Sequence, residues 1–95
     1  IKAGSLGAWF FSANERWFCP SFPVPVKDTT AAGDSFNAGL AWALGQGYDA
    51  PDALRFACAV GGISTTMAGA QAAMPDLNTV SALLQAYPRT VPRRL

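Results

Sequence analysis

The segment of residues 28–42, DTTAAGDSFNAGLAW, constrains the fold more than any other part of the chain. A turn of threonines, alanines and a glycine leads into Asp34, and apolar residues then recur at every fourth position, at Phe36, Leu40 and Leu44. This spacing predicts a helix that begins at Asp34 and ends near Leu44. The first amides of a helix have no partner inside it and lie at the positive end of its dipole. The segment therefore predicts a phosphate site at a helix N-terminus, where small side chains allow close approach.

Asp34, in the same turn, has two interpretations. A carboxylate repels a phosphate that is only bound there, but it can accept the proton of a hydroxyl group that attacks the phosphorus. Alternatively, Asp34 is a helix N-terminal residue that contributes roughly 0.5–2 kcal/mol to stability as a cap. A Gly-Asp pair by itself favours the cap, so the choice depends on the residues around it.

Residues 28–39, DTTAAGDSFNAG, resemble the C-terminal signature of the ribokinase-like (PfkB) carbohydrate kinases, D-T-T-[GA]-A-G-D-[AS]-F-x-[AG]-G. The resemblance extends over about residues 1–87 and leaves residues 88–95 as a tail. It implies an α/β chain that is the C-terminal part of a three-layer α/β/α fold, with a parallel-type sheet, a hairpin and then three helices. The implied function is the ATP-dependent phosphorylation of a sugar or sugar-like hydroxyl, with Mg²⁺ brought in on ATP.

The resemblance also implies roles for individual residues of the signature. Asp34 corresponds to the catalytic base, and the backbone N–H groups of Ala32, Gly33 and Asp34 correspond to the anion hole for the transferred phosphoryl group. A monovalent-cation site, with K⁺ as the candidate ion, is implied by oxygen atoms of six residues, which suit a hard cation. Those residues are Asp28, Thr30, Ser64, Met67, Gly69 and Ala73.

Two further segments are implied to contact the nucleotide. The first is the N-terminal stretch IKAGSLG, whose glycines by themselves indicate only a structural turn. The second is the helix around Cys58, a position where asparagine is common in the family. Cysteine is a departure there, and it leaves shape and stacking as the means of recognising the base. The implied nucleotide contacts are Lys2, Ala3, Gly4, Gly7, Gly33 and Cys58.

The remaining segments predict the secondary structure around this site. Residues 8–19, AWFFSANERWFC, predict a hairpin in which Trp9, Phe11, Trp17 and Cys19 share a face. The proline-rich stretch SFPVPV predicts extended backbone that leads into the signature. A second helix is predicted to start with Asp49 as its cap, and a third helix is predicted to begin near residues 75–78.

Composition excludes several classes of function. With 51% hydrophobic and 14% charged residues, the chain is expected to bury a core. A net charge of +1 without basic runs argues against a nucleic-acid partner, and Arg89, Arg93 and Arg94 are expected in a solvated terminus. Histidine is absent and only two cysteines occur, which excludes Cys/His zinc sites and His-based triads. No apolar run approaches the roughly 20 residues of a membrane span, so a soluble, cytoplasmic protein is expected.

The chain opens at Ile1 in what looks like the end of a buried strand, so we expect it to be part of a longer kinase. In the family the sugar is bound mainly by the N-terminal part and covered by a small β lid, neither of which these residues contain. We therefore expect this part to be inactive alone, with the rest of the kinase chain as its partner. The identity of the sugar and a homodimer stay open. The alternative is a non-catalytic module that binds a nucleotide or completes another subunit.

Overall fold

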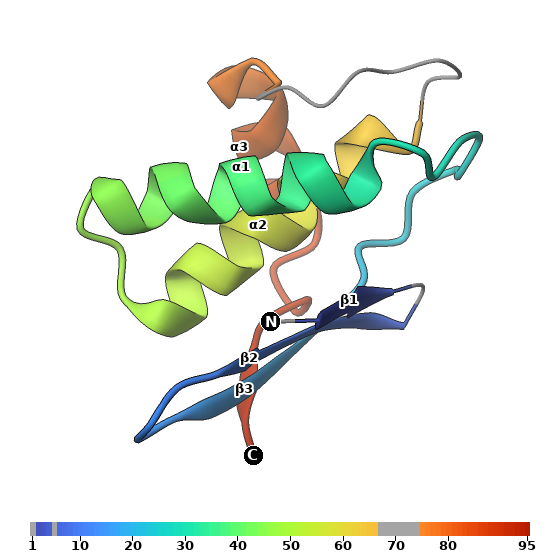
Figure 1. The fold of residues 1–95 in the computed structure, drawn as a ribbon. Coiled ribbons are helices and arrows are strands. Elements are labelled where there is room, and N and C mark those ends of the chain that lie inside the picture. The colour runs from blue at the N-terminus through green and yellow to red at the C-terminus, as the bar shows by residue number, and fades with distance from the viewer. Residues whose placement is uncertain (1, 5, 67–74) are drawn as a thin grey trace.

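The computed structural model describes residues 2–4, 6–66 and 75–95. Its central element is helix α2, which packs against a small sheet on one side and against helix α1 on the other (Figure 1). Helix α3 also packs against α2. The elements in chain order are β1 Lys2–Gly4, β2 Gly7–Phe11, β3 Arg16–Pro20, α1 Ala32–Gly45, α2 Ala50–Ser64, α3 Leu77–Ala86 and β4 Arg93–Arg94.

The sheet has the strand order β1-β2-β3-β4, and each neighbouring pair is antiparallel. The α/β class is as predicted, but the predicted parallel-type pairing is not found among the described strands. The reason lies in the connections. Parallel neighbours need a crossover of about a dozen residues or more, whereas β1, β2 and β3 follow one another through short turns.

The turn between β1 and β2 requires glycine at position 7. Gly4 lies opposite Gly7 in the register, and Gly7 has a φ of +142°, a conformation that residues with a side chain rarely adopt. A Cβ atom at this position would overlap the carbonyl oxygen of Cys19. The glycine therefore lets β2 leave the turn in close contact with β3.

The hairpin of β2 and β3 was predicted correctly, but the predicted aromatic face was wrong. Trp9 lies opposite Phe18, and their ring centroids are 4.8 Å apart. Because residues paired across two strands share a face and neighbours along a strand alternate, Trp9 and Phe11 lie on the face opposite to Trp17 and Cys19. The turn sets this register, and a shift by one residue exchanges the two faces.

Helices α1 and α2 contact each other through glycines. Gly39 of α1 has no room for a side chain, because a Cβ atom there would lie 3.0 Å from the Cβ of Val60. A Cβ atom on Gly61 of α2 would likewise lie only 3.3 Å from the Cβ of Phe36. The predicted cap of α2 is confirmed, since the Asp49 carboxylate accepts a hydrogen bond from the backbone N–H of the third residue of the helix. Close packing of the two helices fixes where α1 begins.

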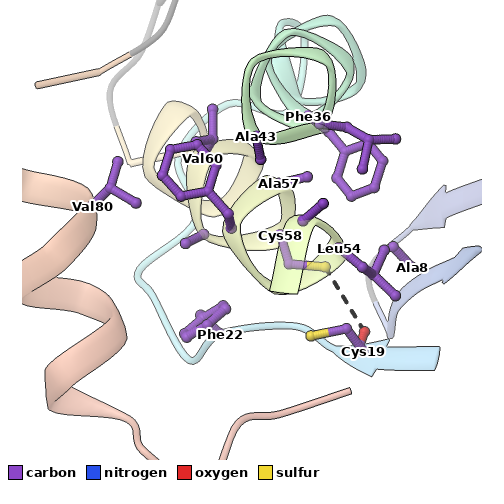
Figure 2. Close-up of a cluster of buried hydrophobic side chains, with 14 residues drawn as sticks. Ala8, Cys19, Phe22, Phe36, Ala43, Leu54, Ala57, Cys58, Val60 and Val80 are labelled. Carbon is purple, nitrogen blue, oxygen red and sulfur yellow. Dashed lines mark hydrogen bonds between the residues drawn. The ribbon is translucent and has the colours of Figure 1, made fainter. Parts of the chain in front are cut away.

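The hydrophobic core lies between α2 and the elements around it (Figure 2). Leu54, Ala57 and Val60 of α2 are completely buried. Core residues from the other elements are Ala8, Cys19, Phe22, Phe36, Leu40, Ala43 and Val80. None of the helices in the described ranges combines the length and apolar character that crossing a membrane requires.

The C-terminal segment differs from the predicted solvated tail. Arg93 and Arg94 are exposed, but they form β4 and pair with β3 along its outer edge. The Arg93 guanidinium lies 5.2 Å from the centre of the Phe18 ring, and Arg94 lies 5.8 Å from that of Trp17. These cation–π contacts and the strand pairing hold the segment on the sheet.

Candidate active site

The loop that leads into α1 is fastened to the end of α2. The backbone N–H groups of Lys27 and Asp28 both donate to the carbonyl oxygen of Thr65, at 2.7 and 3.1 Å. The Asp28 carboxylate in turn accepts from the backbone N–H and the hydroxyl of Thr30, at 2.9 and 2.6 Å. This Asx-type turn gives the signature loop a defined shape before the helix begins.

The N-terminus of α1 presents free backbone amides. The helix starts at Ala32, and no side chain caps it. The Ala32 N–H donates to the Thr29 carbonyl at 3.1 Å, so it is already used. Within the described ranges, the N–H groups of Gly33 and Asp34 have no hydrogen-bond partner, and both residues are exposed. Two of the three predicted anion-hole amides are therefore available to a ligand.

Asp34 lies in the first turn of α1 with its carboxylate in solvent. The position of the N-cap belongs to Ala31, so Asp34 is not the cap that the simpler interpretation assumed. Its charge still interacts favourably with the helix dipole, an effect of about 0.3–1 kcal/mol. An exposed carboxylate next to free amides can accept a proton from a group that an anion-binding turn holds nearby.

A pocket of about 720 Å³ opens beside this turn. It brings together three of the predicted nucleotide contacts, Gly7, Gly33 and Cys58. The other three, Lys2, Ala3 and Gly4, form β1. The lining residues are Gly7, Ala8, Ser21, Phe22, Pro23, Val24, Val26, Thr29, Ala32, Gly33, Phe36, Cys58, Gly61, Gly62 and Thr65.

Much of this lining was not predicted. Phe22, Val24 and Val26 come from the proline-rich stretch, which has no regular secondary structure and forms one wall. The sequence offered one signal for this wall, because the proline-rich stretch continues directly into the signature loop. Among the described residues that line the pocket, none is Asp, Glu, Lys or Arg. The pocket itself therefore suits an uncharged ring system, while a negative charge would be held by the amides at its rim.

Cys58 is almost fully buried, with 8% of its surface exposed, although it lines the pocket. Its sulfur points toward β3 and lies 4.0 Å from the carbonyl oxygen of Cys19 (Figure 2). Burial and the neighbouring Cys19 thiol raise the pKa of Cys58, so this residue is a neutral thiol. Its contribution to the pocket is shape rather than charge.

The predicted cation site falls partly within the described residues. Asp28 and Thr30 lie next to the C-terminal end of α2, which also contains Ser64. The Ser64 hydroxyl donates to the Gly61 carbonyl at 2.7 Å, so its side chain is held by the helix. The remaining residues, Met67, Gly69 and Ala73, lie outside the described ranges. Across residues 2–4, 6–66 and 75–95, no group of three or more His, Cys, Asp or Glu side chains is arranged to hold a metal ion.

Comparison with known proteins identifies the class to which this fold and site belong. The sequence model of the pfkB family of carbohydrate kinases matches residues 1–77, and the chain belongs to this family. The ribokinase of Bacillus subtilis (strain 168) is 44% identical over 84 residues, which are 88% of this chain and 29% of that protein.

Solved structures of ribokinases match the fold of this chain. A putative ribokinase II from E. coli, in complex with ATP and Mg²⁺, superposes on 86% of this chain with a TM-score of 0.80 and 33% identity. The ribokinase of Arabidopsis thaliana, complexed with ribose and ATP, superposes on 85% with a TM-score of 0.77 and 35% identity. This chain spans 27% of each of those structures, so it corresponds to less than a third of such a kinase.

Proposed function

We propose that this chain forms the nucleotide-binding and catalytic side of a kinase that transfers a phosphoryl group from ATP to a sugar hydroxyl. The observation that carries the proposal is the exposed Asp34 carboxylate in the same helical turn as the free amides of Gly33 and Asp34. This turn lies at the rim of an uncharged pocket, which Ala32 and Gly33 help to line. The arrangement combines a proton acceptor with an anion site, which are the two groups that phosphoryl transfer requires.

In the proposed reaction Asp34 accepts the proton of the attacking sugar hydroxyl. General base catalysis of this kind contributes on the order of 10²–10⁴ in rate. The amides of Gly33 and Asp34 stabilise the negative charge on the phosphoryl group as it moves. Because these amides are fixed by the helix, they need no reorganisation when the charge develops.

Different parts of ATP would occupy the pocket and the start of α1. The uncharged lining, with Phe22 and Val24 on one wall, would hold the base and ribose, and the phosphates would extend to the start of α1. Mg²⁺ would enter bound to ATP and neutralise phosphate charge. The E. coli neighbour described above contains ATP and Mg²⁺ together, which supports this pairing.

Ribose is the first sugar to test. Proteins named ribokinase are among the relatives, and the Arabidopsis ribokinase was solved with ribose. We propose that the sugar is bound mainly by parts of the kinase outside this chain and that this part alone does not turn over substrate.

A monovalent cation, with K⁺ as the candidate, would lie beside the turn at Asp28 and Thr30. The hydrogen bonds from the Lys27 and Asp28 amides to Thr65 support the site, because they join the loop that carries Asp28 to the end of α2. By linking the signature loop to α2, the ion would stabilise the anion site.

The decisive experiment compares Asp34→Asn with Asp52→Asn in the complete kinase. Both changes remove a carboxylate from the first turn of a helix, so the loss of dipole interaction is matched. We expect Asp34→Asn to lower ADP release with ribose by about 10²-fold or more, while ATP binding measured by titration calorimetry stays unchanged. Asp52→Asn should retain activity.

Three outcomes would count against the proposal. An Asp34→Asn variant with a tenth of the wild-type rate would remove Asp34 from the base role. Failure of the unmodified kinase to turn over any sugar would favour a non-catalytic nucleotide-binding module. Equal rates in Na⁺ and K⁺ buffers would remove the cation site.

A further inference from the structure

We infer that Cys19 and Cys58 form an oxidant-sensitive dithiol, which a small hydroperoxide converts to a disulfide between β3 and α2. Cys19 is completely buried in β3, and Cys58 lies in α2, 39 positions along the chain. Both are free thiols. The Cys58 sulfur lies 4.0 Å from the backbone oxygen of Cys19, and Figure 2 shows both side chains extending into the gap between α2 and β3.

The ionisation of the two groups is consistent with direct contact between the thiols. A hydrogen bond from Cys58 lowers the pKa of Cys19, against the opposing effect of burial. The same hydrogen bond, together with burial, raises the pKa of Cys58. Cys58 therefore keeps its proton, and its thiol donates to the carbonyl oxygen of Cys19. Because the Cys58 sulfur already lies beside the backbone of Cys19, a small movement of two packed elements can join the side chains once their Cβ atoms are about 3.5–4.5 Å apart, as a disulfide needs.

Access to the pair is through the pocket. Cys58 is among the lining residues and retains 8% exposure, whereas Cys19 has none. A reagent of the size of hydrogen peroxide can enter a pocket of about 720 Å³, where Cys58 is the residue of the pair that it meets. A bulky thiol reagent would have to displace the core around both residues. A hydroperoxide should therefore reach the pair where large disulfides do not, and Cys19, whose pKa is lowered, is the sulfur expected to react with it first.

The chemistry balances with one hydroperoxide. One sulfur takes an oxygen from hydrogen peroxide, giving a sulfenic acid and one water. The second thiol then attacks the sulfenic sulfur, the S–O bond breaks, and the hydroxyl leaves with the thiol proton as a second water. Two thiols are oxidised to one disulfide, and the peroxide is reduced to two molecules of water. A dithiol reductant reverses the change.

The cross-link would join two walls of the pocket. Gly7 and Ala8 lie on β2 beside β3, and Gly61 and Gly62 continue α2 beyond Cys58. A covalent bond between β3 and α2 therefore limits how far these walls can separate. The part of the proposal that concerns a bound nucleotide rests on the proposed function, whereas the formation of the disulfide does not.

The test is a peptide map of the reduced, purified protein after treatment with hydrogen peroxide. Trypsin releases Cys19 in peptide 17–27 and Cys58 in peptide 56–89. We expect these two peptides to appear joined, with the mass of two hydrogen atoms lost, and to separate after reduction. The oxidised protein should also melt at a higher temperature than the reduced protein. Cys19→Val and Cys58→Ala, which keep an apolar core, should show neither change.

The map of the unmodified sequence decides the question even if a variant does not fold. Absence of the joined peptide, or oxidation of either cysteine to a sulfinic or sulfonic acid without it, would overturn the dithiol and leave the kinase proposal unaffected. Saturating ATP should slow cross-linking by filling the pocket. If ATP does not slow cross-linking, the dithiol proposal stands, but the proposal that the nucleotide binds in this pocket is overturned.

Discussion

Gly33 shows how a single residue can matter for function without mattering for the fold. Among the described residues, a Cβ atom at this position would meet no heavy atom within 4 Å, and its φ is not in the region that favours glycine. The packing of the described residues therefore gives no reason for glycine here. The neighbouring free amides and the pocket give one, since a methyl group would occupy the space through which a phosphoryl group approaches them.

Gly33→Ala is therefore predicted to separate stability from activity. Alanine in a helical turn should leave the free energy of unfolding unchanged or raise it by up to about 1 kcal/mol. The kcat of the complete kinase should fall by about 10²-fold, because the phosphoryl group is displaced from its amides. Thermal melting and ADP release on the same sample measure both. Unchanged turnover would mean that no anion approaches this amide.

At the scale of elements, the position of the site depends on how closely α1 and α2 pack. Gly39 leaves room for Val60, and Gly61 approaches the Ala32 carbonyl and Phe36 so closely that a Cβ atom there would lie 3.3 Å from either. Small residues on both helices thus allow α2 to touch the first turn of α1. Positions 39 and 61 need glycine because the helices pack closely there. Backbone conformation is not the reason, since neither glycine has a positive φ.

Gly39→Ala is predicted to destabilise the fold by about 1–3 kcal/mol, because the added methyl group overlaps the Val60 side chain. Gly45→Ala, at the C-terminal end of the same helix, is the matched control. A Cβ atom there meets nothing within 4 Å, so the change should stabilise by up to about 1 kcal/mol. Denaturant unfolding of both variants makes the comparison. Equal effects would show that helix propensity, not the contact with Val60, decides the outcome.

At the scale of the whole molecule, Arg55 connects α2 to the C-terminal third of the chain. Its guanidinium donates to the carbonyl oxygens of Leu84 and Tyr87 at the end of α3, at 2.9 and 3.0 Å, and to that of Thr90 at 2.7 Å. It also lies 5.6 Å from the centre of the Phe22 ring, which lines the pocket. One cation thus satisfies carbonyls that a helix end leaves without partners and holds the segment that leads to β4.

Replacing Arg55 by methionine should lower the free energy of unfolding by about 2–4 kcal/mol, because several carbonyls lose a charged donor at once. Arg89→Met is the control, since Arg89 lies exposed in the segment between α3 and β4. Urea unfolding should show a large effect for Arg55 and an effect within about 0.5 kcal/mol for Arg89. Similar small losses for both variants would mean that the tail is held by the sheet alone.

The sequence by itself determined the family, the three helices, the hairpin and the start of the candidate site. The signals for these are local, since they come from apolar spacing in α1, the Asp49 cap and the run of residues in the signature. Nearby residues decide such features, and they survive in any arrangement of the rest of the chain.

Only the tertiary structure decided which residues from different segments lie next to each other. The pairing of β4 with β3, the contact of Cys58 with Cys19 and the bonds of Arg55 join residues far apart in the chain. The pocket wall at Phe22 and the register of the hairpin also appear only in the folded chain. Periodicity does not carry that information, because strand register and helix packing depend on the fit between surfaces. The signature therefore predicted where the candidate site begins, while the walls around it depended on the packing of the folded chain.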